Sequence, residues 1–349
     1  MNRLSISAII PTYNRATLVL RSLDSVLREL EADDEAIVVD DGSTDDTAEV
    51  LKPYLGRIRY FRIENRGAGH ARNFGVAQAT KPLIAFQDSD DEWMPGKIAI
   101  QRNFMQARPD VLFCFSDIAV TFKDGSSQHN YLPKWHNDSR SWDEILGPGQ
   151  LFSSLAPLPE HFSDFKFHVG DLAPMMLKSP CVPTNTAVIR RAEAGDALRF
   201  AEDLPLLEDC ECFSRLSLKG KAAYLDCETA WQHDHKGARL TDGDLLSRAQ
   251  SRIVILERVW GADAEFMKRE GKLQREILQE HRLLEISELI SLGRTREART
   301  KIALLGNSPP LAVRILASLP GALSLNILKA RRLAKSGFGA LKAIRNQDR

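Results

Sequence analysis

The sequence is poor in cysteine and has no apolar run long enough to cross a membrane as a helix. Its five cysteines in 349 residues form no CxxC pair, and an odd number of scattered cysteines does not indicate a disulfide framework in a chain of this length. No segment approaches about 18 consecutive apolar residues, and the apolar run near the N-terminus is too short for a signal-peptide core. We therefore expect reduced thiols, no transmembrane helix and a cytoplasmic protein.

An excess of charge of either sign is also missing. Lys plus Arg and Asp plus Glu each number 47, which argues against a general nucleic-acid-binding surface and against acidic disorder. The chain is 43% hydrophobic and long enough for a substantial core, with room for two domains. Functional charge must therefore be local, and the clearest example is the acidic stretch "FQDSDDEW" at residues 86–93.

The first third of the chain alternates short β-rich runs with helical patterns. Strands are expected at residues 5–11, 35–41, 57–63, 82–86 and 111–122, and helices at residues 17–30, 43–55, 69–79 and 95–107. This rhythm predicts an α/β fold with a mostly parallel central sheet flanked by helices. Ligands of such sheets bind beyond the carboxyl ends of the strands, so the polar residues there are candidates for a site.

The rest of the chain changes character twice. Residues 124–183 are irregular, with scattered Pro, Trp and His, which predicts loops and short helices rather than a second layered core. Beyond about Asp244 the pattern is almost wholly helical. We therefore expect a helical C-terminal region.

Acidic residues follow two of the predicted strands. Asp40 and Asp41 end one strand, and Asp88, Asp90 and Asp91 follow another. An Asp-x-Asp pair such as Asp88 and Asp90 can offer two hard oxygen ligands to Mg²⁺ or Mn²⁺, with phosphate and water completing the shell. The alternative is that these carboxylates only favour the start of the next helix near residue 95.

Two further segments offer groups that could hold a nucleotide. "PTYNR" at residues 11–15 supplies Thr12, Asn14 and Arg15 after the first strand. "NRGAGHARNFGVA" at residues 65–77 is rich in glycine but is not a dinucleotide fingerprint, because Arg72 stands where GxGxxG needs glycine. It leaves Arg72 available to orient a phosphate or the acidic turn.

Together these motifs resemble the family 2 glycosyltransferases, whose fold is the nucleotide-sugar-binding GT-A type. "PTYNR", "VVDDGSTDDT", "NRGAGHARNFG" and "FQDSDDEWMPGK" occur in the family's order. "SPCVPTNTAVIRR" is similar to the family's acceptor-side segment, and "PLLEDCECFSRLSLKG" to the stretch that carries its catalytic residue. The resemblance covers residues 4–242 and implies a GT-A domain at 1–243, with a nucleotide-binding half (1–110) and an acceptor half (111–243), followed by a helical region at 244–349.

The resemblance also implies roles for individual residues. Asp209 is expected to be the general base, with Glu208 as the alternative, and Asp88 and Asp90 the metal-binding pair, with Asp90 the more direct ligand. The residues expected to contact or support the nucleotide are Pro11, Thr12, Asn14, Arg15, Asp40, Asp41, Arg72 and Asp88.

Histidines near the end of this domain leave alternatives open. His235 fits best the family's histidine that binds diphosphate or completes the metal shell, His233 lies close to it, and either could be a surface residue without a role. A zinc site made from Cys210, Cys212 and Cys227 with these histidines is disfavoured, because CxC is not the usual knuckle spacing. Buried thiols explain the cysteines better.

The resulting expectation is an inverting, Mg²⁺- or Mn²⁺-dependent enzyme of surface polysaccharide biosynthesis. It would transfer one sugar from a nucleotide diphosphate sugar to a hydroxyl of a glycan or lipid-linked acceptor, with no nucleic acid as partner. The alternatives are a non-catalytic module that binds sugar nucleotides or glycans, and a nucleotidyltransferase, which would need a phosphate loop that "AIIPTYNR" lacks. The basic segment 311–349 either packs on the body or lies on the inner membrane face.

Overall fold

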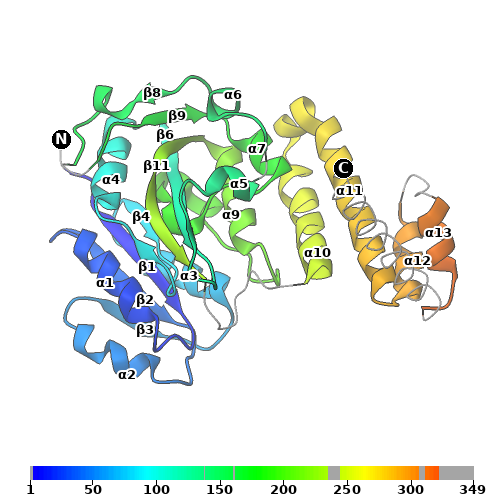
Figure 1. The fold of residues 1–349 in the computed structure, drawn as a ribbon, viewed down its shortest axis with the longest axis horizontal. Coiled ribbons are helices and arrows are strands. Elements are labelled where there is room, and N and C mark those ends of the chain that lie inside the picture. Colours follow the sequence, from blue (N-terminus) through cyan, green and yellow to red (C-terminus); the bar gives the residue numbers. More distant parts are fainter. Residues whose placement is uncertain (1–2, 137, 160–161, 235–243, 306–310, 322–349) are drawn as a thin grey trace, which may run out of the picture. The chain divides into compact units, whose positions relative to one another are not determined.

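The computed structural model describes residues 3–136, 138–159, 162–234, 244–305 and 311–321. The chain divides into two compact units, Met1–Ala238 and Arg239–Arg349 (Figure 1). The first unit is built on an eleven-stranded mixed sheet, whereas the described residues of the second unit form helices.

The sheet of the first unit has a parallel half and a mixed half. Its strand order is β3-β2-β1-β4-β10-β6-β11-β9-β8, with β5 pairing β11 and β7 pairing β6. The strands are β1 (Ile6–Thr12), β2 (Glu35–Asp40), β3 (Arg59–Arg62), β4 (Leu83–Phe86), β5 (Glu92–Trp93), β6 (Val111–Thr121), β7 (Ser127–Gln128), β8 (Gln150–Leu151), β9 (Lys166–Gly170), β10 (Val188–Arg190) and β11 (Lys221–His233). Strands β1 to β4 run parallel, and β10 lies antiparallel between β4 and β6.

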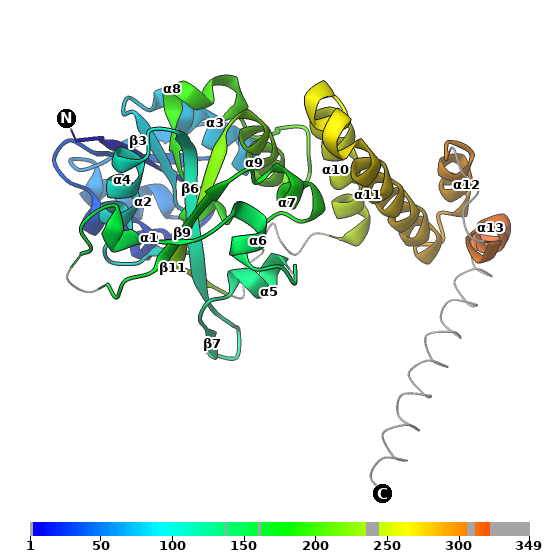
Figure 2. The same ribbon diagram turned by 90° about the horizontal axis from the view of Figure 1, so that it is seen from above.

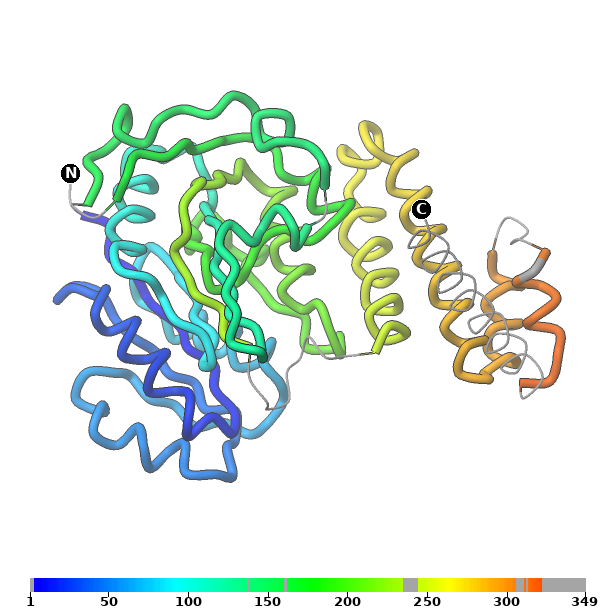
Figure 3. The backbone as a smooth tube through the Cα atoms, viewed as in Figure 1, coloured from blue at the N-terminus to red at the C-terminus, as the bar shows by residue number. Residues whose placement is uncertain are grey.

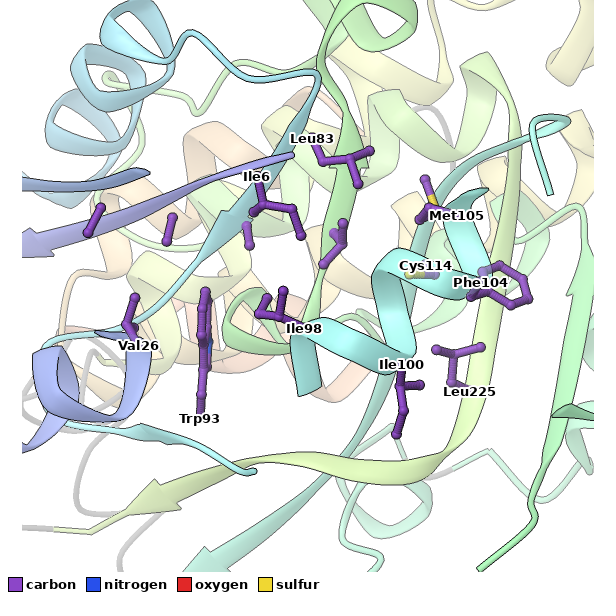
Figure 4. Packing of buried hydrophobic residues seen from close by; sticks show 14 of the residues in the cluster. Ile6, Val26, Leu83, Trp93, Ile98, Ile100, Phe104, Met105, Cys114 and Leu225 are labelled. Carbon is purple, nitrogen blue, oxygen red and sulfur yellow. The ribbon is translucent and has the colours of Figure 1, made fainter. Parts of the chain in front are cut away.

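Helices cover both faces of the parallel half. Alternate residues of β1, among them Ile6 and Ile10, join a buried cluster with α1 (Val19–Glu29) and α4 (Lys97–Ala107) (Figure 4). Ile9 faces the other way, toward α3 (Ala68–Gln78), where a Cβ on Gly75 would lie 2.4 Å from its Cγ2. Glycine at position 75 therefore lets α3 lie close against β1, and the period-two pattern of the strand separates the two layers.

The remaining helices of the first unit are short, apart from α9. They are α2 (Thr47–Leu51), α5 (Leu132–His136), α6 (Trp142–Leu146), α7 (Ala173–Lys178), α8 (Arg191–Ala194) and α9 (Glu208–Lys219), with a 3₁₀ turn at Thr184–Thr186. The hairpin of β6 and β7 extends beyond the body of the unit (Figure 2). Strand β11 runs parallel beside β6 and ends at His233 (Figure 3).

One expectation for residues 124–183 was wrong in part. The short helices are present, but β9 also lies in this segment and pairs with β11. Phe167 on β9 packs edge-on against Phe104 of α4, with ring centroids 5.3 Å apart. The strand is thus held by the sheet and the core rather than by a long apolar run of its own.

The helical C-terminal region is confirmed. It contains α10 (Leu245–Ile255), a π-helical turn (Leu256–Trp260), α11 (Ala264–Ser291), α12 (Thr295–Ala303) and α13 (Leu311–Ser318). Its small core includes Leu246, Ile286 and Leu289. Across the described ranges of the whole chain, no helix is long and apolar enough to cross a membrane. Of the basic segment 311–349, residues 322–349 lie outside the described residues.

Candidate functional site

The predicted site residues lie on neighbouring segments at one edge of the sheet. Pro11 and Thr12 end β1, and Asp40 ends β2. The backbone N–H of Asp41 donates to the carbonyl of Thr12 at 2.9 Å, which fixes the two strand ends side by side. This arrangement follows from the parallel pairing of β1 with β2, because parallel strands present their carboxyl ends at the same edge.

The loop after β1 is fastened to the loop after β2. Asn14 adopts a left-handed backbone conformation with φ 50°. Its backbone N–H donates to Ser43 Oγ at 2.9 Å, and its Oδ1 accepts from the backbone N–H of Thr44 at 2.8 Å. The backbone N–H of Arg15 donates to Thr47 Oγ1 at 2.9 Å. The side chain of Asn14 therefore helps to connect the two loops. Asparagine tolerates the left-handed backbone conformation at this position better than most residues do.

Asp40 and Asp41 have different environments although they are adjacent. Asp40 is fully buried and accepts from the backbone N–H of Ser43 at 2.8 Å and from the hydroxyl of Tyr60 at 2.7 Å. Asp41 accepts from the backbone N–H groups of Arg66 and Gly67 at 3.0 and 2.8 Å. Burial raises the pKa of Asp41 above its usual range, in opposition to those two hydrogen bonds. Asp40 thus braces the loop, and Asp41 faces the glycine-rich segment.

Arg72 joins two of the predicted carboxylates. This residue of α3 is 6% exposed, and its Nη2 donates to Asp88 Oδ1 and its Nη1 to Glu208 Oε1, both at 2.8 Å. Its guanidinium also lies 5.3 Å from the ring centre of Phe200. Burial alone would lower the pKa of Arg72, but the neighbouring carboxylates raise it above its ordinary value. Arg72 is therefore a permanent cation that bridges the acidic turn and the start of α9.

The turn after β4 presents Asp88 and Asp90, and their contacts differ. The Asp88 side chain is 31% exposed beside Arg72. The Asp90 side chain is 17% exposed, and its Oδ2 lies 3.5 Å from Arg15 Nε. The backbone carbonyl of Asp90 accepts from Arg21 at 2.6 Å. Two arginines from separate segments thus hold the two carboxylates of the Asp-x-Asp pair.

Asp91 links this turn to distant parts of the chain. Its carboxylate accepts from Asn185 Nδ2 and from the backbone N–H of His233, each at 3.0 Å. His233 Nε2 lies 2.9 Å from Glu92 Oε1, and burial together with Arg21 lowers the pKa of His233. The pairing of β5 with β11 thus places His233 beside the acidic turn, whereas His235 lies outside the described residues.

Asp209 lies next to Glu208 at the start of α9. Its Oδ2 accepts from Thr184 Oγ1 at 3.2 Å, and its Oδ1 accepts from the backbone N–H of Cys210 at 2.7 Å. Burial and, after it, the charge of Glu208 raise the pKa of Asp209 to about 6, against the opposing effect of Arg72. Because Glu208 binds Arg72 and Asp209 accepts from Thr184, the two adjacent carboxylates have different environments.

Sequence reasoning gave no role to Thr184 and Asn185, although both lie in the quoted segment "SPCVPTNTAVIRR". They are 5% and 4% exposed. Their partners, Asp209 and Asp91, lie 25 and 94 residues away in the chain. Spacing along the sequence carries no signal for such contacts.

The cysteines form no metal site in the part of the chain that the structure describes. No group of three or more His, Cys, Asp or Glu residues there could hold a metal ion by itself. Each of the five cysteines, all of them among the described residues, is a thiol rather than half of a disulfide. Burial raises the pKa of Cys212 to about 12, so this thiol is protonated near neutral pH. Of the cysteines in the zinc alternative, Cys210 and Cys212 are buried and Cys227 is partly buried.

Part of the chain is similar in sequence to known glycosyltransferases. Residues 7–154 match the model of Glycosyl transferase family 2. The chain is 34% identical over 145 residues to the putative teichuronic acid biosynthesis glycosyltransferase TuaG of Bacillus subtilis, covering 40% of this chain and 56% of TuaG. It is 43% identical over 94 residues to the succinoglycan biosynthesis protein ExoU of Rhizobium meliloti, covering 26% of this chain and 27% of ExoU. An uncharacterized glycosyltransferase of Rickettsia bellii is 41% identical over 103 residues, which are 29% of this chain and 15% of that protein.

Solved structures match over more of the chain at lower identity. S. aureus TarS residues 1–349, solved with UDP-GlcNAc, aligns with a TM-score of 0.56 and 17% identity over 95% of this chain and 92% of that chain. The mannosyltransferase PcManGT of Pyrobaculum calidifontis, solved with GDP-Man and Mn²⁺, aligns with a TM-score of 0.50 and 17% identity over 93% of this chain and 81% of that one. These likenesses confirm the expected fold class.

Proposed function

Because residues 7–154 match the model of Glycosyl transferase family 2, we propose that the chain transfers one sugar from a nucleoside diphosphate sugar to a hydroxyl group, with inversion at the anomeric carbon. The acceptor is a glycan or a lipid-linked sugar of surface polysaccharide biosynthesis. The names of TuaG and ExoU support this pathway, and the nucleotide sugars bound by TarS and PcManGT support the donor class.

The observation that carries the proposal is that the adjacent carboxylates of Glu208 and Asp209 have different environments. Glu208 binds Arg72 at 2.8 Å, whereas Asp209 has a pKa raised to about 6 by burial and by Glu208. A group with such a pKa is mostly ionised at neutral pH and still basic enough to take a proton. Asp209 is therefore the general base, with Glu208 held in a supporting role.

The reaction needs one base and no protonating acid. The Asp209 carboxylate takes the proton of the acceptor hydroxyl while that oxygen forms a bond to the anomeric carbon. The bond from that carbon to the diphosphate oxygen breaks, and the electron pair leaves with the nucleoside diphosphate. Direct displacement places the new bond on the opposite face of the sugar, so the configuration inverts. Thr184, which donates to Asp209 Oδ2, helps to fix the direction of the carboxylate.

The acidic turn fits a divalent ion that is shared with the donor. Asp90 and Asp88 are hard oxygen ligands on one turn, and the described residues offer no third ligand for a closed protein cage. Mg²⁺ and Mn²⁺ commonly use one or two carboxylates and take their remaining ligands from substrate phosphates and water. Asp90 would hold the ion, with Asp88 as the second carboxylate, and a bound ion would neutralise charge on the leaving diphosphate.

The nucleoside is proposed to lie along the loops after β1 and β2. Thr12 Oγ1 is buried and has no hydrogen-bond partner among the described residues. Asp41 is held by two backbone N–H groups, which leave each carboxylate oxygen further lone pairs for a base N–H or a ribose hydroxyl. Asn14 and Asp40 keep these loops in place, and Arg15 connects them to Asp90.

We propose a cytoplasmic location, with residues 311–349 resting on the inner face of a membrane. On α13, Leu311 and Ile315 are 69% and 51% exposed, and they are four residues apart on one helix face. Arg314 lies between them in the sequence. Sedimentation with vesicles that contain anionic lipids, at low and high salt, tests this contact; no sedimentation at low salt contradicts it.

The function is tested first by nucleotide binding. A ligand that binds only the folded state raises its stability by RT ln(1 + [L]/Kd), so melting curves are compared with UDP, GDP, dTDP and CDP, with and without Mn²⁺. We expect metal-dependent stabilisation by one nucleotide, its loss in Asp90→Ala, and its retention in Asp209→Asn. The stabilising nucleotide then selects the donor for transfer assays. Binding without turnover in the wild type would favour a non-catalytic binding module.

A further inference from the structure

A lysine lies entirely inside the core of the first unit. Lys97, the first residue of α4, is 0% exposed. Its Nζ donates to Gln101 Oε1 at 2.6 Å and to Thr229 Oγ1 at 3.4 Å, and it lies 5.2 Å from the ring centre of Trp93. Burial lowers the pKa of Lys97 to about 7. An apolar residue here would avoid the free-energy cost of burying an amino group. The presence of a lysine at this position therefore requires a structural or functional explanation.

Two residues next to the Lys97 amino group, Thr229 and Trp93, belong to segments that reach the candidate site. Thr229 is part of β11, the strand that ends at His233, and its carbonyl accepts from the backbone N–H of Met94 at 2.9 Å. The indole N–H of Trp93 donates to the carbonyl of Phe86 at 3.2 Å, and Phe86 ends β4 just before the acidic turn. Figure 4 shows Trp93 beside the start of α4.

The third connection runs through Gln101. This residue is also 0% exposed, and its Nε2 donates to the carbonyl of Thr186 at 2.6 Å. Thr186 closes the 3₁₀ turn Thr184–Thr186. The same turn carries Thr184, which donates to Asp209, and Asn185, which donates to Asp91. A chain of buried polar contacts therefore runs from Lys97 to the proposed base and to the acidic turn.

We propose that Lys97 and Gln101 are positioning residues that hold the Thr184–Thr186 turn against Asp209 and Asp91. They set the turnover rate through this turn and contact neither the donor nor the acceptor. The kinetic part of this inference rests on the proposed function, whereas the part that concerns local order in the turn does not. The competing explanation is a polar pair that stabilises the core in general, without a specific effect on the turn.

The test compares two variants with a matched control. Lys97→Met and Gln101→Met keep an unbranched side chain, of equal length for Gln101 and one atom shorter for Lys97, and remove the polar contacts. Arg102→Met is the control, because Arg102 lies next to Gln101 on α4, is equally buried at 3% exposure and forms ion pairs with Glu31 and Asp34 instead. Should Lys97→Met fail to fold, Gln101→Met carries the same test. Melting temperatures of all variants show the general loss of stability.

The first measurement is hydrogen exchange, which needs no enzymatic activity. The backbone N–H of Thr186 donates to Pro183 at 3.0 Å and that of Ala187 to Thr184 at 3.3 Å. We expect these two amides to exchange at least about tenfold faster in Lys97→Met and Gln101→Met than in Arg102→Met; tenfold corresponds to about 1.4 kcal/mol. Wild-type exchange in the first two variants, or equal acceleration in the control, would overturn the proposal.

The second measurement separates kcat from KM for the donor selected by the binding assay. We expect kcat to fall at least about tenfold in Lys97→Met and Gln101→Met, with KM within about threefold of the wild type, and both constants to be unchanged in Arg102→Met. An unchanged kcat in the two variants, or an equal loss in the control, overturns the positioning role. If the wild type itself has no transferase activity, the proposed function fails, and hydrogen exchange alone still decides whether the pair orders the turn.

Discussion

The pH dependence of turnover should reveal the proposed base. Asp209 must be ionised to take a proton, and burial, followed by the charge of Glu208, raises its pKa to about 6. Turnover should therefore be constant above about pH 7 and fall on acidification, with a midpoint near the pKa of Asp209 in the complex. At one pH unit below the midpoint about one molecule in eleven keeps the carboxylate ionised, so the rate should be about a tenth of its plateau.

Substitution of Glu208 predicts the direction in which this midpoint moves. Glu208→Gln removes a negative charge that raises the pKa of Asp209, so the acidic limb should move to lower pH by about one unit. If Glu208 were the base, the same variant would instead lose nearly all turnover, while Asp209→Asn would keep it. The two assignments thus predict opposite results from one pair of variants.

The assay is the initial rate of nucleoside diphosphate release at saturating donor, from about pH 4.5 to 8.5. Slow hydrolysis of the donor serves if the acceptor has not been found, because water then takes the place of the hydroxyl. Circular dichroism at each pH separates loss of activity from unfolding. A rate that stays constant down to pH 4.5, or a limb that does not move in Glu208→Gln, would refute the assignment of Asp209.

Three further predictions concern stability. The pKa of Asp209 is higher in the folded protein than its ordinary value of 3.8. Ionisation of Asp209 therefore lowers the free energy of unfolding above about pH 6 and has no such effect below about pH 4. Asp209→Asn should raise the free energy of unfolding, measured in urea, by about 1 to 3 kcal/mol at pH 7.5 and leave it unchanged at pH 4. Gly75→Ala should lower that free energy by about 1 to 3 kcal/mol, because the new Cβ would lie 2.4 Å from a side chain of β1, whereas Gly56→Ala, with nothing within 4 Å, should have no such effect. Tyr60→Phe removes the hydrogen bond to the buried Asp40 and should lower the free energy of unfolding by about 1 to 2 kcal/mol. An unchanged urea midpoint would contradict the bracing role of Asp40.

The parallel half of the fold could be predicted because its signals are local. The strand expected at residues 35–41 is β2 (Glu35–Asp40), and the helix expected at 95–107 contains α4 (Lys97–Ala107). Strand β10 (Val188–Arg190) was not predicted, because three residues give no periodicity. It exists because β4 and β6 offer hydrogen bonds on both of its sides, and a sequence pattern does not contain that context.

The site could be predicted in part for the same reason. Motifs at strand ends located Asp41, Asp88 and Asp90 on neighbouring segments, since parallel strands share an edge. The bridge from Arg72 to Glu208 spans 136 residues, and no local pattern reveals it. The same is true of Lys97, which looks in the sequence like an ordinary surface residue of a helix start. The roles of these residues in catalysis stay predictions until the variants are measured.

The position of β10 has a consequence during synthesis of the chain. Strand β4 ends at Phe86, but its second neighbour in the sheet is completed only at Arg190. At about 5 to 20 residues per second, the ribosome needs about 5 to 20 s to reach that point. During this interval the nascent parallel half has an unpaired strand edge, which can associate with other chains. Release of the first 110 residues alone should therefore yield an aggregation-prone fragment rather than an independently folded half.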